Sequence, residues 1–156
     1  MRIRPGRNLI RLLAVALAAS LLVFAVPEIV LFALLVFAVL LVLAVWDMVN
    51  ARRLLADLNV ARRLPGMAGR DLPFRVTWLL ERSSPGLLSG ELRDCLPREA
   101  NPFMHQEAFW FANDEAAIEL NTSLRIPVRG EFHFGPIWLR IHGRLGLIEV
   151  QKAFEV

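Results

Sequence analysis

The chain has 156 residues, of which 56% are hydrophobic, with a formal net charge of +3 and one cysteine, Cys95. A single cysteine excludes an intramolecular disulfide and a zinc site built from cysteines. The positive charge does not indicate nucleic-acid binding, because the arginines bracket two apolar runs and form no basic stripe.

The two apolar runs, Leu12–Val26 and Ile29–Trp46, are separated by Pro27 and Glu28. Each run is about long enough to cross a bilayer, so the sequence predicts a two-helix transmembrane hairpin with spans at about 9–26 and 29–50. Arginines precede the first run and follow the second, which by the positive-inside rule places both termini in the cytoplasm. The expected anchors at the membrane interface are Arg11, Trp46, Arg52 and Arg53.

Asp47 and Glu28 are interpreted as boundary residues and not as buried ionisable groups. A cleaved signal peptide is an alternative to the hairpin, since Ala16-Leu17-Ala18 resembles a cleavage motif that follows a basic segment. The continuation of the apolar segment to Val26 and the second run favour the hairpin. The hairpin would form a domain of residues 1–55, with a second domain at 56–156.

From about residue 56 onward the chain has room for one modest core. After a turn at Arg62–Gly66, apolar and polar residues alternate, which indicates half-buried strands. The expected strands are Phe74–Leu80, Leu88–Leu96, Ile118–Ile126, Glu131–Phe134, Ile137–His142 and Leu147–Phe154. Short strands separated by Pro and Gly turns predict an antiparallel β-sandwich of immunoglobulin-like type, with Cys95 half-buried in a strand.

No pattern of catalytic or metal-binding residues emerges. The histidines His105, His133 and His142 form no helical pair, and no Walker loop or nucleophile elbow occurs. We therefore expect no enzyme activity and no cofactor. The aromatic residues Phe103, Phe109, Trp110 and Phe111 are expected to fill the core. A shared outward parity suggests a docking face for a protein partner, made of His133, Trp138, Arg140 and His142.

The segments Arg129–Arg140 and Gly143–Glu149, with an Arg-Arg-Leu-Pro approach at Arg62–Pro65, resemble the bacterial family called domain of unknown function 58. The resemblance implies two transmembrane helices and a β-sandwich that ends in this motif. Its members usually continue into a von Willebrand factor A-like domain, whose Asp-x-Ser-x-Ser metal motif does not occur here. The motif residues expected to have a structural role are Arg129, Gly130, Gly135, Pro136 and Gly146.

The leading hypothesis is a noncatalytic interaction protein of the bacterial inner membrane, with its β domain in the cytoplasm. The resemblance implies partnership with a MoxR-type AAA+ ATPase or a von Willebrand A-type protein, in the maturation of envelope proteins or complexes. The other partner is the lipid bilayer, and self-association through the transmembrane helices stays open. A truncated or split product is the alternative, and a small transporter or channel subunit is disfavoured because the spans lack interior ionisable residues.

Overall fold

The computed structural model describes residues 1–21, 29–102 and 104–155, as helices and antiparallel strands. The chain forms two compact units. The helical unit comprises Arg2–Arg53 with His142–Val150, and the sheet unit comprises Leu54–Ile141 with Gln151–Val156. The fold is therefore α+β, with a sheet-rich, sandwich-like arrangement and one long apolar helix.

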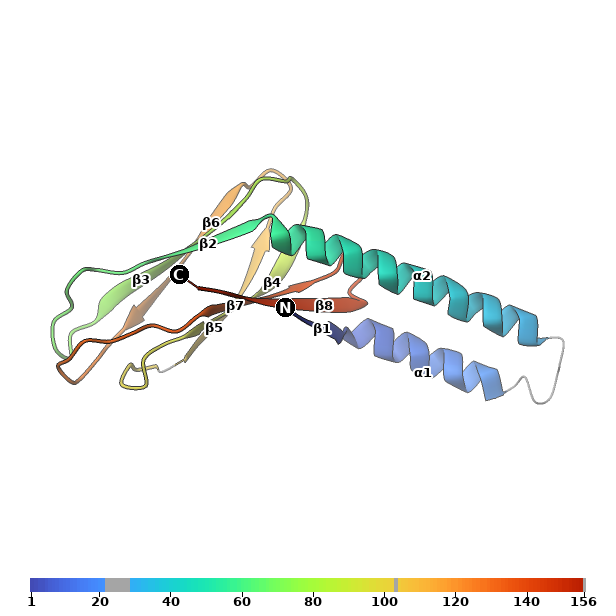
Figure 1. Ribbon diagram of the computed structural model, residues 1–156, viewed down its shortest axis with the longest axis horizontal. Coiled ribbons are helices and arrows are strands. Elements are labelled where there is room, and N and C mark those ends of the chain that lie inside the picture. Colours follow the sequence, from blue (N-terminus) through green and yellow to red (C-terminus); the bar gives the residue numbers. More distant parts are fainter. Residues whose placement is uncertain (22–28, 103, 156) are drawn as a thin grey trace. The chain divides into compact units, whose positions relative to one another are not determined.

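The sheet unit contains strands of two sheets (Figure 1). One sheet has the order β2-β3-β6, formed by Leu58–Arg63, Phe74–Arg82 and Ala117–Leu124. In the other, β7, β4 and β5 are neighbours in that order, formed by Ile137–His142, Leu88–Cys95 and Met104–Phe111. All of these pairings are antiparallel. The last strand, β8, is Ile148–Phe154.

Alternate residues of the strands fill the core of the sheet unit. Val76, Trp78 and Leu80 on β3 are fully buried, as the period of two predicted. The matching face of β7 buries Ile137, Leu139 and Ile141, while the residues between them stay half-exposed. The predicted strands at 74–80, 88–96, 118–126, 137–142 and 147–154 are thus confirmed, within a few residues at their ends.

Other expectations about the strands were wrong. No strand forms at Glu131–Phe134, since these four residues pair with no strand. Pro127 and Pro136 border it and can donate no ladder hydrogen bond. Two strands of the sheet unit, β2 and β5, were not expected. The predicted aromatic core is confirmed for Phe109 and Phe111 but wrong for Trp110, which is 73% exposed; Phe103 lies outside the described residues.

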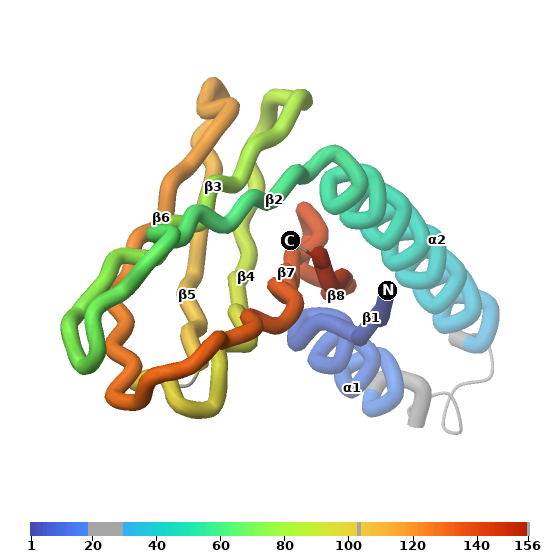
Figure 2. The backbone as a smooth tube through the Cα atoms, turned by 60° about the vertical axis from the view of Figure 1, so that its left-hand side comes forward, coloured from blue at the N-terminus to red at the C-terminus, as the bar shows by residue number. Residues whose placement is uncertain are grey.

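The helical unit contains β1, Arg2–Pro5, which neighbours β8, and two helices, α1 at Arg7–Leu21 and α2 at Ile29–Ala56. Both views draw α1 alongside α2 (Figure 1 and Figure 2). Among the described residues, Val30–Ala56 is the one helix long and apolar enough to cross a membrane, with a mean hydropathy of 2.8 over its most apolar stretch. The two-helix transmembrane hairpin is thus supported only in its second helix. The predicted turn at Pro27 and Glu28 lies outside the described residues.

Candidate functional sites

A buried carboxylate near the carboxyl end of α2 binds the tip of the β7–β8 hairpin. Asp47 is fully buried. Its Oδ1 accepts a hydrogen bond from the backbone N–H of Leu145 at 2.9 Å, and its Oδ2 accepts from Leu147 at 2.9 Å and Ile148 at 3.1 Å. Backbone donors that converge on one group form a nest for an anion, filled here by a side chain of the same unit. We call this arrangement the Asp47 clasp.

The expectation that Asp47 is not a buried ionisable group was wrong. Its burial depends on residues about one hundred positions later in the chain, whose backbone N–H groups supply the missing hydrogen bonds. The sequence did carry a signal, because Asp47 is the only carboxylate within α2 and a glycine-containing turn, Gly143–Gly146, precedes β8.

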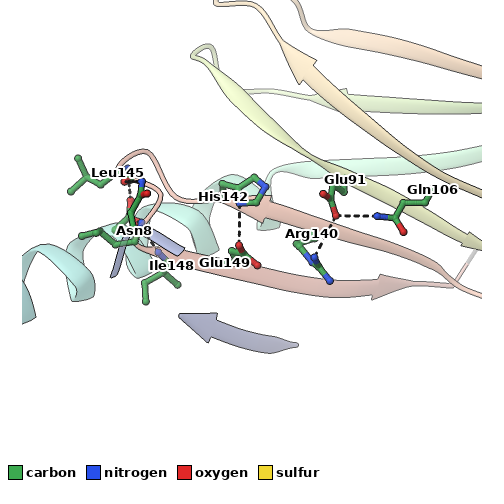
Figure 3. Close-up of polar contacts among 10 residues, drawn as sticks. Asn8, Glu91, Gln106, Arg140, His142, Leu145, Ile148 and Glu149 are labelled. Atoms are coloured by element: carbon green, nitrogen blue, oxygen red, sulfur yellow. Dashed lines mark hydrogen bonds and ion pairs between the residues drawn. The ribbon is translucent and has the colours of Figure 1, made fainter. Parts of the chain in front are cut away.

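Two glycines give the hairpin tip the geometry that the clasp needs. A β-carbon on Gly143 would overlap the carboxyl group of Asp47. Gly146 has a φ of +64°, a left-handed conformation that glycine adopts without a steric penalty. The N–H of Gly6 donates to the carbonyl of Leu147 at 2.7 Å, and Nδ2 of Asn8 lies 3.4 Å from the carbonyl of Leu145 (Figure 3). The tip is therefore held by both α2 and the start of α1.

A polar network in the sheet unit connects its two sheets. Asp94 on β4 lies with Oδ1 2.7 Å from Nη1 of Arg62 on β2, and its Oδ2 accepts from Nε1 of Trp78 on β3 at 2.8 Å. The side chains of Arg62 and Asp94 are 3% and 0% exposed. His105 on β5 stacks on Trp78, with ring centroids 4.6 Å apart. Buried charges of this kind are tolerated because each is paired and hydrogen-bonded.

The positions of these four residues follow from strand register. Arg62 is directly opposite Trp78 in one sheet, and Asp94 is directly opposite His105 in the other. The guanidinium of Arg62 also donates to the carbonyl of Gly135, at 3.1 and 3.2 Å. Arg62 was expected to lie in a turn and to contribute to the positive charge beside the membrane; it is instead a core residue.

The structure brings together only some of the residues of the predicted docking face. Trp138 and Arg140 alternate with buried residues on β7, and Nη1 of Arg140 lies 3.4 Å from Oε2 of Glu91 (Figure 3). His142 belongs to the helical unit, where its Nδ1 lies 3.6 Å from Oε1 of Glu149. His133 is exposed and lies outside any strand, so the parity that grouped it with the others does not exist.

Sequence reasoning missed the exposed tryptophan on this surface. Cross-strand partners lie on the same face of a sheet, and Trp110 is opposite Ser89 on β4. Ser89 and Glu91 are two residues apart, so Trp110 shares a face with Glu91. Gln106 also lies on this face, with Nε2 3.4 Å from Oε2 of Glu91. We use the name outer β4 face for the surface formed by Glu91, Gln106, Trp110, Trp138 and Arg140.

The residues of the family motif lie in different settings. Arg129 and Gly130 are exposed in the loop that precedes β7, and Pro136 comes directly before that strand. The N–H of Gly135 donates to the carbonyl of Cys95 at 2.8 Å, and a β-carbon on Gly135 would lie 2.8 Å from that of Cys95, too close for another residue. Gly135 is thus a point of close approach. Cys95 itself is half-buried at the end of β4.

The predicted interface anchors all lie on the helices. Arg11 is on α1, and Trp46, Arg52 and Arg53 are on α2; all four side chains are exposed. In the part of the chain that the structure describes, no group of three or more His, Cys, Asp or Glu side chains could hold a metal. Every buried side-chain nitrogen or oxygen there has a hydrogen-bond partner. The buried polar groups thus serve to hold elements together.

An open pocket of about 600 Å³ lies in the sheet unit, lined by the β2–β3 loop and the segment after β6. Arg70 and Arg129 contribute to its lining beside Phe132 and Phe134. The Nε of Arg70 donates to the carbonyl of Pro127 at 3.0 Å, which joins the two segments.

Comparison with protein-family models gives no match, and no curated protein matches the chain.

Proposed function

We propose that this chain is a noncatalytic, membrane-anchored interaction protein, in which α2, paired with α1 as a hairpin, anchors an immunoglobulin-like β-sandwich to the bacterial inner membrane. The supporting observation is the apolar surface of α2. Only 6% of its most apolar stretch is buried in the structure. Each large apolar side chain left in water forgoes about 1.5–3 kcal/mol, so this helix requires an apolar environment such as lipid.

The proposed orientation puts both ends of the hairpin and the β-sandwich in the cytoplasm. It rests on the distribution of arginine, because Arg7 and Arg11 at one end of α1 and Arg52 and Arg53 at the end of α2 favour the cytoplasmic side. Within the helical unit, the Asp47 clasp holds the tip of the β7–β8 hairpin at the end of the proposed span.

Cysteine labelling tests both parts of this proposal. In a Cys95→Ser background, Met67→Cys provides a thiol on a side chain that is 95% exposed in the β2–β3 loop. Glu28→Cys, outside the described residues, provides a thiol at the proposed far side of the hairpin. An impermeant maleimide should label the second variant in intact spheroplasts and the first only after lysis. Labelling of Met67→Cys in intact spheroplasts would contradict the cytoplasmic orientation, and extraction of the chain by alkaline carbonate would contradict the anchor.

The proposed partner is a MoxR-type AAA+ ATPase or a von Willebrand A-type protein, which rests on the family resemblance. We propose that the outer β4 face binds it, because Trp110 and Trp138 supply aromatic area beside charged groups, a composition common in protein interfaces. Replacing Trp138 and Arg140 together with alanine should abolish capture of such a partner from native membranes without unfolding the domain. The matched control replaces Arg75 and Glu119, on the outer face of the other sheet, and should leave capture unchanged.

A further inference from the structure

The helical unit contains a pocket of about 440 Å³ that the function above does not use. The first turns of α1, one residue of α2 and the tip of the β7–β8 hairpin line it: Asn8, Arg11, Leu12, Leu43, Leu145 and Leu147. The lining is thus made of leucine side chains with one cation and one amide.

Hydrogen bonds of the lining residues hold the walls of this pocket in place. The hairpin wall is fixed by the Asp47 clasp, which binds the N–H groups of Leu145 and Leu147. Nδ2 of Asn8 lies 3.4 Å from the carbonyl of Leu145, which joins the α1 wall to the hairpin (Figure 3). The helix walls remain open, because Leu12 and Leu43 are 41% and 39% exposed. Part of the apolar lining is therefore accessible to a ligand.

The helical unit that contains the pocket is rich in exposed arginine, and Arg11 is the charged residue in the pocket lining. The exposed arginines of the helical unit are Arg2, Arg4, Arg7, Arg11, Arg52, Arg53 and Arg144. The acidic residues described in this unit are Asp47, which is buried in its clasp, and Glu149, which faces His142. Little negative charge in the described part of the unit opposes the arginines, so an anion is the complementary ligand.

We infer that this pocket binds an anionic phospholipid. The lipid phosphate pairs with the guanidinium of Arg11, and the upper part of one acyl chain lies against Leu12 and Leu43. Arginine suits this role because its planar guanidinium pairs with phosphate through two parallel hydrogen bonds. The leucine lining distinguishes a lipid from a soluble anion, which would gain nothing from apolar walls. This inference rests on the proposed function, because only a chain in a membrane meets the lipid.

Fluorescence quenching by brominated lipid measures the preference directly. Trp46 follows Leu43 by three residues on α2, which places both side chains on one face of the helix, and it is 48% exposed. The full chain is reconstituted in phosphatidylcholine vesicles that contain a small fraction of either brominated phosphatidylglycerol or brominated phosphatidylcholine. A Trp46→Phe variant supplies the background from the other tryptophans. We expect phosphatidylglycerol to be enriched about fivefold beside Trp46. This is about the factor by which one arginine strengthens attraction to an anionic membrane surface.

Two matched pairs of variants separate a site from diffuse attraction. Arg11→Gln should abolish the enrichment, whereas Arg52→Gln, an exposed arginine of the same unit outside the pocket, should retain most of it. Leu43→Phe should reduce it by filling the pocket, whereas Leu41→Phe, on the same helix but outside the lining, should not. Equal losses within each pair, no enrichment in the parent chain, or loss of enrichment on adding inorganic phosphate at matched ionic strength would overturn the inference.

The same vesicles separate this inference from the proposed function. Flotation of the chain with pure phosphatidylcholine vesicles tests the anchor without any anionic lipid. A chain that floats but shows no phosphatidylglycerol enrichment contradicts the lipid site alone. A chain that does not float contradicts the membrane anchor and the lipid site together.

Discussion

Replacing Asp47 with alanine should release the tip of the β7–β8 hairpin from α2. The change leaves three backbone N–H groups without their acceptor, and two of them, on Leu147 and Ile148, are in buried hydrogen bonds. An unsatisfied buried donor costs about 1–3 kcal/mol, so the two buried donors together cost about 2–6 kcal/mol. Asp47→Asn should have a smaller effect, since one carbonyl oxygen can still accept while the amide group faces a donor.

Amide hydrogen exchange of the reconstituted chain measures this loss locally. We expect the amides of Leu147 and Ile148 to exchange at least about 30-fold faster in Asp47→Ala, as the lower bound of about 2 kcal/mol implies. Asn50→Ala is the matched control, because Asn50 lies on α2 and its side chain donates only to the carbonyl of Trp46, at 3.0 Å. Unchanged protection in Asp47→Ala, or equal acceleration in both variants, would refute the reasoning.

Three further changes test the sheet unit and the hairpin. Asp94→Asn should lower the free energy of unfolding by about 3–5 kcal/mol, because it removes the negative charge that pairs with the buried guanidinium of Arg62. Thermal unfolding followed by tryptophan fluorescence measures this loss, and a loss below about 1 kcal/mol would contradict the importance of the buried pair. Gly146→Ala should lower the free energy of unfolding by about 1–2 kcal/mol in the same assay, because a φ of +64° is a left-handed conformation that alanine resists. An unchanged midpoint of thermal unfolding would exclude this geometry. The N–H of Ser84, 2.7 Å from Oδ2 of Asp57, lowers the pKa of that carboxyl below its ordinary value of 3.8, so its ionised form stabilises the folded chain above pH 3.8. That contribution should disappear as the pH falls from 3.8 through the folded pKa, and a folded-state NMR titration with a midpoint at or above 3.8 would contradict it.

Alternation of apolar and polar residues predicted β3, β4, β6, β7 and β8, because a half-buried strand needs only its own inward residues to be apolar. Strand β2 was missed because its inward residue Arg62 looks like a surface charge. Strand β5 was missed because two of its half-buried positions hold His105 and Glu107, whereas the alternating pattern of a strand requires apolar residues there. Both exceptions involve partners on other strands, which the periodicity of one segment does not reveal.

The candidate sites were harder to predict than the strands. The Asp47 clasp joins residues 98 to 101 positions apart, and the burial of its carboxylate depends on backbone groups whose direction the sequence does not specify. The docking face was predicted from strand parity, which holds for Trp138 and Arg140 but fails at His133, because no strand exists there. Trp110 was assigned to the core by composition, whereas the register of β5 against β4 places it outside.

The network around Asp94 also affects the register in which the strands pair. Sliding a strand by two residues keeps every apolar side chain on its inner face, so burial alone tolerates that error. The same slip would move Arg62 or Asp94 by about 6.6 Å along its strand and break a contact of 2.7 Å. Misaligned pairings would then leave a charge alone in an apolar interior, so this pair selects one alignment of β2, β3 and β4 from among those that the hydrophobic pattern permits.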